Sequence, residues 1–225
     1  MKKTLKDVTL LGLDCINLDR LVLAADICRQ NFDFAEVKLL TSLPPHGCEH
    51  TIKIEPILSI ERYSNFLISQ IHRYIETSHV LVIQYDGFIL NPSAWRDTFL
   101  EYDYIGAPWY HLGPNLRVGN GGFSLRSKKL MELAAHRFSE QKTDYCHPED
   151  VWICHDTRPF LESNGIHFAP ETIAKHFSFE ADLRHRKWNG QFGFHGGVWR
   201  TNISKWLVHN RAYKQNWLAR SISKR

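Results

Sequence analysis

Apolar runs alternate with amphipathic stretches along most of this 225-residue chain. Short apolar runs of the kind found in buried strands lie at residues 8–13, 36–40, 52–54 and 80–83. Apolar positions at helical spacing follow Asn17 and Ser59, and both residue types are common helix caps. This alternation of strands and helices predicts an α/β fold.

The helix expected after Ser59 has a stripe of apolar and aromatic residues on one side. Its members are Tyr63, Phe66, Leu67, Ile71 and Tyr74. Periodic stripes of this kind usually face a core, so we expect core packing here rather than a cofactor pocket.

The second half of the chain has shorter patterns. We expect strands at 104–106 and 123–125, a helix from Ser127 to about residue 138, and a helix with Pro148 at its first position. No internal repeat or linker divides the chain. We therefore expect one domain over residues 1–198, followed by a basic helical tail at 199–225.

The composition agrees with one folded domain. With 43% hydrophobic and 12% aromatic residues the chain can bury a sizeable core, which excludes the disordered class. The five cysteines form no CxxC pair, which indicates reduced thiols. The apolar run at 8–13 is too short for a secretion signal or for crossing a membrane. We expect a cytoplasmic protein.

The charge is unevenly distributed. The formal net charge is +4, and residues 199–225 contain seven Lys or Arg and no Asp or Glu. Such a segment can bind anionic lipid headgroups, so we expect peripheral association with the inner face of a membrane. A solvated helix face and contact with nucleic acid are the alternatives. No RNA- or DNA-reading motif accompanies the basic residues, so we expect no nucleic-acid partner.

A carboxylate follows the strand expected at 80–83. The strand ends in Gln84, Tyr85 and Asp86. In open α/β sheets, ligands bind at the carboxyl ends of the strands. A lone carboxylate at that edge suits a hard divalent cation that holds phosphate oxygens, so Asp86 is the first candidate metal ligand.

Polar residues also follow the first expected strand. Asp14, Asn17 and Arg20 are candidates for contacts with the base or phosphates of a nucleotide. Surface roles at the start of a helix are the alternative for all three.

An acidic pair, Glu149 and Asp150, stands at the expected start of a helix. A carboxylate within reach of an acceptor hydroxyl can take its proton during attack, and the second carboxylate can orient hydroxyl groups. The alternative is an ordinary helix start, where acidic residues are common.

Residues 119–126 read Gly-Asn-Gly-Gly-Phe-Ser-Leu-Arg, which lacks the spacing of a dinucleotide fingerprint or a phosphate loop. Glycines here would let the backbone approach a ligand closely. The candidates for ligand contacts are Asn120, Gly121, Gly122, Ser124 and, by stacking of its ring, Trp109. A tight turn before a strand is the alternative for the glycines, and core packing is the alternative for Trp109.

Two cysteine–histidine pairs contain side chains that can bind zinc. They are Cys146-His147 and Cys154-His155, and their spacing matches no familiar structural zinc site. We therefore expect no zinc.

Five segments in this order resemble a bacterial glycosyltransferase-like family that is often left as a domain of unknown function. They are QYDGF at 84–88, DYIGAPW at 103–109, GNGGFSLR at 119–126, PED at 148–150 and FGFHG at 192–196. The resemblance covers about residues 5–198. It implies a GT-A type fold, a single domain with a Rossmann-like mixed sheet flanked by helices, in which a nucleotide-binding half joins an acceptor-binding half.

The resemblance also implies roles for individual residues. Asp86 would be the last acid of an Asp-x-Asp motif whose first acid is replaced here by Gln84, which can form hydrogen bonds but supplies no charge. His195 would be a second metal ligand, and an imidazole ligand favours manganese over magnesium. The alternative for His195, one of 13 histidines, is a structural role. By analogy with inverting relatives, Asp150 is the favoured base. The ligand contacts expected from the glycine-rich segment and Trp109 would be contacts with a sugar.

The resemblance therefore predicts a glycosyltransferase that moves a sugar, in the manner of a hexosyltransferase, from a nucleotide diphosphate to a glycan or lipid-linked acceptor. We expect a part in surface polysaccharide synthesis, Mn²⁺ or Mg²⁺ as cofactor, and inversion at the anomeric carbon, with retention left open. Two rival hypotheses stay open. One is a non-catalytic protein that binds nucleotide or carbohydrate on the same scaffold, and the other is a nucleotidyltransferase.

Overall fold

The computed structural model describes residues 1–45, 47–109, 113, 116, 118–141, 146–181 and 188–196. The basic tail expected at 199–225 lies outside the described residues. Within those ranges, no helix combines the length and the apolar character needed to cross a bilayer.

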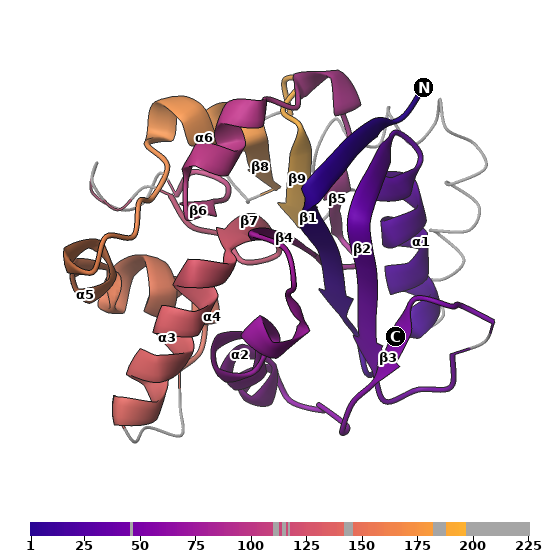
Figure 1. The fold of residues 1–225 in the computed structure, drawn as a ribbon, viewed down its shortest axis with the longest axis horizontal. Helices are drawn as coiled ribbons and strands as arrows, with labels where there is room; N and C mark the ends of the chain where they lie inside the picture. The colour runs from indigo at the N-terminus through magenta and orange to yellow at the C-terminus, as the bar shows by residue number, and fades with distance from the viewer. Residues whose placement is uncertain are drawn as a thin grey trace.

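Helices and strands alternate through the first half of the chain, as Figure 1 shows. The strands are β1 (Lys3–Leu13), β2 (Phe32–Thr41), β3 (Thr51–Lys53), β4 (His79–Ile83), β5 (Gly87–Ile89), β6 (Tyr104–Ile105), β7 (Phe123–Ser127), β8 (Ser178–Ala181) and β9 (Gly193–Gly196). The helices are α1 (Leu18–Arg29), α2 (Ile60–Ser69), α3 (Lys128–Gln141), α4 (Glu149–Val151), α5 (Arg158–Ser163) and α6 (Glu171–Phe177). A π-helical turn, Trp152–Asp156, continues α4.

Six strands form the main sheet in the order β3-β2-β1-β4-β7-β6. The four strands from β3 to β4 are parallel, whereas β7 runs antiparallel to both β4 and β6. The sheet is therefore mixed and flanked by helices, which confirms the predicted α/β fold class.

Strand β4 lies at the centre of this sheet, and all five of its residues are buried. Ile83, its last residue, pairs with Gly12 of β1 on one side and with Phe123 of β7 on the other. The carboxyl ends of β1 and β4 and the amino end of β7 therefore share one edge. This arrangement brings three distant segments of the chain together.

Helices cover both faces of the sheet. Figure 1 shows α1 beside β1 and β2, and α2 next to α3 on the other side of the molecule. Helix α1 also packs against β5, where the backbone N–H of Ile89 donates to the Cys28 thiol at 3.5 Å. The stripe predicted after Ser59 faces the interior, and Leu67 and Ile71 are fully buried.

A second, three-stranded sheet has the order β5-β9-β8. Strand β5 begins only four positions after β4 ends, so the chain passes almost directly from one sheet into the other. Strand β9 pairs antiparallel with β5 and parallel with β8. The sequence did not predict β8 or β9, because each has only four residues.

Helix caps confirm two predictions. The Ser59 hydroxyl accepts from the Arg62 N–H at 3.3 Å, and the Ser127 hydroxyl accepts from the Leu130 N–H at 3.0 Å. The helix after Ser59 ends at Ser69 and is followed by a separate 3-10 turn over Ile71–Tyr74.

Two other helix starts differ from the predictions. Asn17 occupies the N-cap position of α1, as predicted, but its side chain forms no capping hydrogen bond. The carboxylate of Asp14 fixes the turn that leads into this helix, because it accepts from the N–H groups of Ile16 and Asn17, both at 2.8 Å. Pro148 occupies the cap position before α4, after a cis peptide bond, rather than the first helical position.

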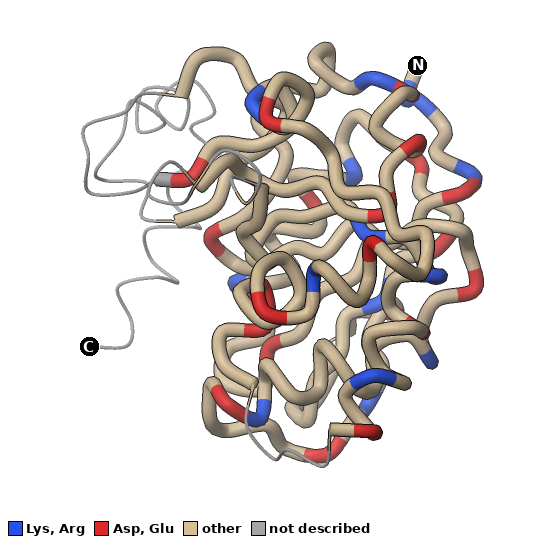
Figure 2. Tube along the Cα trace, turned by 90° about the vertical axis from the view of Figure 1, so that its left-hand side faces the viewer, with Lys and Arg blue, Asp and Glu red and all other residues tan. Residues whose placement is uncertain are grey.

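Lys and Arg are interspersed with Asp and Glu along the trace in Figure 2. The 28 basic residues of the chain include the seven of residues 199–225, which leaves 21 against 24 acidic residues in residues 1–198. The main part of the chain therefore has a formal net charge of −3, and the basic excess comes from the tail.

Gly106 offers a test of how closely the backbone after β6 packs against Gly119 and Asn120. A Cβ atom at this position would overlap the Gly119 carbonyl oxygen and lie 2.8 Å from the Asn120 carbonyl oxygen. Backbone atoms cannot move aside as a flexible side chain can, so we expect Gly106→Ala to lower the free energy of unfolding by about 1–3 kcal/mol. Gly113→Ala, which adds a Cβ with nothing within 4 Å, is the control. Equal denaturant midpoints for the two variants would contradict the packing described here.

Candidate active site

Asp86 and His195 meet at the junction of the two sheets. Gly87 of β5 pairs with His195 of β9, and the Gly196 N–H donates to the Asp86 carbonyl at 3.0 Å. These backbone contacts hold His195 Nε2 at 3.7 Å from Asp86 Oδ1. The two predicted metal ligands, 109 positions apart in the sequence, therefore lie side by side.

Both ring nitrogens of His195 have polar neighbours. Nδ1 lies 3.2 Å from Glu180 Oε2, and Nε2 lies 3.2 Å from Gln84 Oε1. Burial of the ring opposes protonation, but the hydrogen bond to Glu180 and the charges of Glu180, Asp86 and Asp150 outweigh it. Together they raise the pKa of His195 to about 9.

Gln84 is fixed at both ends of its amide. Its Nε2 donates to the Tyr63 hydroxyl at 2.8 Å, while Oε1 faces His195. Burial and the nearby negative charge of Glu149 raise the pKa of Tyr63, so its hydroxyl stays neutral. Gln84 therefore connects α2 to the Asp86–His195 pair, although it lacks the charge of an acid at this position.

One observation indicates that the Asp86–His195 pair fits a cation. Asp86 Oδ1 is buried and has no hydrogen-bond partner, which is costly for a carboxylate oxygen unless another group approaches it. A carboxylate and an imidazole are suitable ligands for manganese. Within the described part of the chain, no three His, Cys, Asp or Glu side chains form a metal cluster, so further ligands would have to come from phosphates or water.

The glycine-rich turn lies directly beside this pair. Asn120 has a positive φ of 67°, and the Gly121 N–H donates to Asp150 Oδ2 at 2.9 Å. A Cβ on Gly122 would overlap the His195 ring, and one on Gly121 would overlap the Glu149 carboxylate. The glycines are thus needed because side chains of the site pack onto the turn.

Glu149 and Asp150 have different surroundings. Glu149 is 6% exposed, and its Oε1 accepts from Nη2 of Arg126 at 3.1 Å. Burial and the neighbouring Asp150 raise the pKa of Glu149, against the opposite effect of Arg126. Asp150 is partly exposed, and its two oxygens accept from the N–H groups of Gly121 and Val151, each at 2.9 Å. Of the two acids, only Asp150 is partly exposed, and its carboxylate accepts a hydrogen bond from the backbone of the glycine-rich turn.

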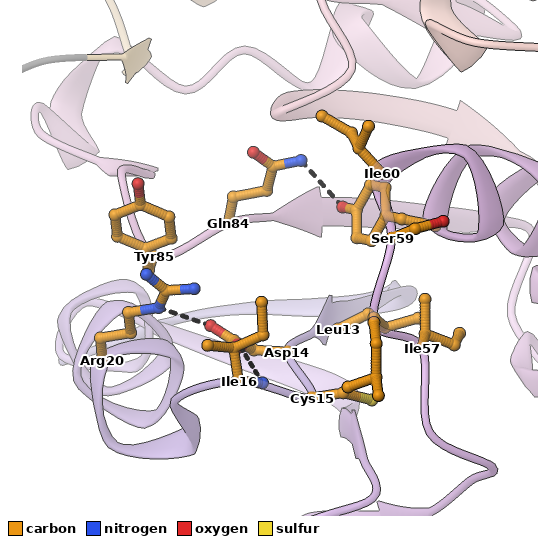
Figure 3. A pocket seen from close by; sticks show the side chains of 12 residues that line it. Leu13, Asp14, Cys15, Ile16, Arg20, Ile57, Ser59, Ile60, Gln84 and Tyr85 are labelled. Carbon is orange, nitrogen blue, oxygen red and sulfur yellow. Dashed lines mark hydrogen bonds and ion pairs between the residues drawn. The ribbon is translucent and has the colours of Figure 1, made fainter. Parts of the chain in front are cut away.

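A pocket of about 260 Å³ opens between the β1–α1 turn and the start of α2. Figure 3 shows Arg20 and Tyr85 on one side of it and Ile57, Ser59 and Ile60 on the other. The Arg20 guanidinium lies 3.8 Å from the centre of the Tyr85 ring. The pocket therefore combines largely apolar walls with one fixed cation.

Of the three residues predicted to contact a nucleotide, Asp14 and Arg20 line this pocket, whereas Asn17 does not. Asp14 is 7% exposed and already accepts three hydrogen bonds, including one from Arg20 Nε at 2.6 Å. Asp14 thus organises the pocket wall and orients Arg20. Tyr63 and Gln84 also line the pocket, which links it to the Asp86–His195 pair.

Three predicted sugar-contacting side chains lie in the interior. Trp109 is 8% exposed and packs on Gly119, Asn120 is 4% exposed, and Ser124 is fully buried. Ser124 Oγ donates to the Gly121 carbonyl at 3.2 Å and accepts from Arg126 Nε at 2.9 Å. These positions do not support direct sugar contacts by Trp109 or Ser124, and they match the alternatives of core packing and a tight turn.

Sequence reasoning missed four residues of the site: Glu180, Arg126, Tyr63 and Tyr85. The last could have been found, because Tyr85 stands between Gln84 and Asp86. Tyr63 was assigned to the core stripe of α2. Arg126 ends the GNGGFSLR segment, but nothing in the sequence pairs it with Glu149, 23 positions away. Glu180 gave no signal, because its partner His195 is 15 positions away.

Comparisons with known proteins add a family and a fold. A family model described as "Protein of unknown function (DUF5672)" matches residues 49–195. No curated protein matches the chain. Among solved structures, the apo form of the glycosyltransferase GlyE from Streptococcus pneumoniae TIGR4 is similar, with a TM-score of 0.53 and 14% sequence identity. That match covers 98% of this chain and 64% of GlyE, so the chain spans less than two thirds of its neighbour.

A second GlyE structure from the same strain matches with a TM-score of 0.44 and 14% identity, over 75% of this chain and 45% of GlyE. Because the identity is only 14%, the first match shows the fold alone. The chain has a glycosyltransferase-like fold.

The cysteines provide a test of burial around the site. All five are free thiols, as predicted. Burial raises the pKa of Cys28 and of Cys146 to about 12 each, and it raises the pKa of Cys154 further. At pH 8 only about one such thiol in ten thousand is ionised, and the thiolate is the reactive form.

We therefore expect an aromatic disulfide reagent to label half-buried Cys48 first in the folded protein at pH 8. The substitution Cys48→Ser should remove the fast phase, whereas Cys28→Ser, the control, should leave it unchanged. Fast labelling of Cys28, Cys146 or Cys154 before unfolding would show that these thiols are not buried as described.

Proposed function

Because the chain belongs to the DUF5672 family, whose description is "Protein of unknown function", we propose its function from the fold and the site: it is a metal-assisted glycosyltransferase. It would move a sugar from a nucleotide diphosphate to a glycan or lipid-linked acceptor. The GlyE-like fold supports this class of enzyme. The single observation that carries the proposal is the buried Asp86 Oδ1, which has no hydrogen-bond partner and lies 3.7 Å from His195 Nε2 beside a pocket.

The pocket suits the nucleoside end of the donor. Its walls of Leu13, Ile16 and Ile57 can cover the flat faces of a base, and Arg20 can donate to oxygens of the base, ribose or phosphates. Gln84 and Tyr63 line the same pocket and lead to the Asp86–His195 pair. The diphosphate would thus extend from the pocket toward that pair.

Asp86 and His195 would hold the cation. A bound divalent cation neutralises the charge that develops on the departing diphosphate. Gln84 lowers the negative charge of the site relative to an Asp-x-Asp pair, so we propose a modest affinity that increases when phosphate oxygens complete the ligand set.

Asp150 is the proposed base. Its carboxylate is partly exposed, and hydrogen bonds from Gly121 and Val151 fix its orientation. It would take the proton of the acceptor hydroxyl as the oxygen attacks the anomeric carbon, which gives inversion. Glu149 is instead committed to buried Arg126 and would support the turn from behind.

The acceptor and the location of the enzyme are also parts of the proposal. A lipid-linked acceptor would agree with binding of anionic headgroups by the basic residues of 199–225. The enzyme would then act at the inner face of a membrane in surface polysaccharide synthesis.

The base assignment predicts that Asp150→Asn lowers sugar transfer by about 10²–10⁴-fold. The amide keeps an oxygen that can accept from Gly121, so donor affinity measured by calorimetry should stay within a few-fold of the wild-type value. The matched control is Asp156→Asn, at a side chain that is 54% exposed. Full transfer activity of the Asp150 variant would reject this residue as the base.

The metal assignment predicts that Asp86→Asn abolishes the stimulation of donor hydrolysis by Mn²⁺, because the ligand loses its charge. Hydrolysis is measured with a panel of nucleoside diphosphate sugars, with and without Mn²⁺. Asp97→Asn makes the same change at a side chain that is 72% exposed, and it should have no effect.

The products separate the remaining hypotheses. Release of a nucleoside diphosphate supports sugar transfer, whereas release of pyrophosphate would indicate a nucleotidyltransferase. Nucleotide binding without turnover of any donor would favour a non-catalytic binding protein.

A further inference from the structure

Glu180 lies opposite His195 on the neighbouring strand. Strands β8 and β9 are parallel, and their register pairs Glu180 with His195. The two side chains meet with Glu180 Oε2 at 3.2 Å from His195 Nδ1, and they are 24% and 22% exposed. A hydrogen bond between partly buried groups on paired strands restricts how the ring can rotate.

The contact also determines which ring nitrogen has the proton in the neutral imidazole. A carboxylate can only accept, so Nδ1 must donate to Glu180, and the lone pair of the neutral ring is then on Nε2. Nε2 is the nitrogen that lies 3.7 Å from Asp86 Oδ1. Glu180 therefore directs the metal-binding lone pair toward the proposed cation.

Asn120 and Gln84 are the competing neighbours. Asn120 Nδ2 lies 3.1 Å from the same Nδ1 and would favour the opposite tautomer by donating to it. Gln84 Oε1 lies 3.2 Å from Nε2 and would accept a proton bound there, whose place the proposed cation would take. The carboxylate is the stronger partner because its hydrogen bond is charge-assisted. The Asn120 side chain has a separate role, since its Oδ1 accepts from the Phe123 N–H at 3.4 Å within the turn.

We propose that Glu180 is a positioning residue of the cation site: it holds His195 through Nδ1, so that Nε2 can bind the cation shared with Asp86. The inference rests on the proposed function, because it assumes that a cation binds there. Carboxylates behind a metal-binding histidine commonly contribute about 10–100-fold to metal affinity. Glu180 contributes by orientation and does not touch the donor or the acceptor.

The test uses Mn²⁺ alone, with no nucleotide, and measures its dissociation constant by electron paramagnetic resonance on the full chain. We expect Glu180→Ala to weaken Mn²⁺ binding by about 10–100-fold. Glu180→Gln keeps a carbonyl oxygen that can accept from Nδ1, so it should lose much less. The reference is His195→Ala, which removes the ligand, and the control is Glu132→Ala at an exposed position of α3.

A purely structural role would not give the same pattern. If Glu180 only stabilised the fold, Glu180→Ala would lower the melting temperature without changing the Mn²⁺ affinity of the folded protein, and that result would overturn the inference. Added acetate should partly restore Mn²⁺ binding by Glu180→Ala but not by His195→Ala. If Glu180→Ala does not fold, Glu180→Asp replaces it, and wild-type affinity in that variant would equally reject the role.

The outcomes also separate this inference from the proposed function. Wild-type protein that binds Mn²⁺, together with a Glu180→Ala variant of equal affinity, would reject only the role of Glu180. Wild-type protein with no more affinity than His195→Ala, both for Mn²⁺ alone and with a saturating nucleoside diphosphate present, would reject the cation site itself, and the inference with it.

Discussion

The pairing of Gly87 with His195 is the constraint on which the site depends. The chain leaves the main sheet after Ile83 and enters the small sheet at Gly87, so Asp86 lies at the crossing point between them. Because β9 must align with β5 for its backbone hydrogen bonds to form, His195 has no choice of partner along that strand. The site is thus placed by backbone pairing, and side-chain packing then refines it. A shift of one residue in this register would turn the imidazole to the opposite face of the sheet.

Surroundings give two adjacent acids different properties. Glu149 points inward to a buried arginine, while Asp150 is partly exposed and is fixed by backbone N–H groups of the glycine-rich turn. Burying two charges away from water costs free energy, and a buried charge without its partner costs more. Arg126 and Glu149 therefore stabilise each other, and together they hold the glycine-rich turn in place. The carboxylate that stays partly accessible is therefore the one we propose as the base, although the two residues are neighbours in the sequence.

Much of the main sheet could be predicted, because the second halves of β1 and β2 and most of β4 have strand patterns that are local in the sequence. The family resemblance also pointed to Asp86 and His195, which the fold brings together. The small sheet could not be predicted, because strands as short as β8 and β9 form only through pairing with distant partners. The same reason hides Glu180. The position of Asn17 before α1 could be predicted, but the role of Asp14 could not, because its carboxylate acts from the end of β1 on the N–H groups of the turn before the helix.

The amide of Gln84 has a consequence for how ligands act on one another. It joins the Tyr63 hydroxyl, in the wall of the pocket, to the imidazole of His195. A ligand in the pocket that forms a hydrogen bond with the Tyr63 hydroxyl would replace the Gln84 amide there. The freed amide could then shift, which would change its contact with the His195 ring. Binding of the proposed nucleotide and binding of the proposed cation would then be thermodynamically coupled. By reciprocity, the cation would alter nucleotide affinity by the same factor as the nucleotide alters cation affinity. A carboxylate at position 84 could accept from the tyrosine and would also bind the proposed metal directly. The glutamine found here lacks that charge, and it links the pocket to the imidazole through its two hydrogen bonds.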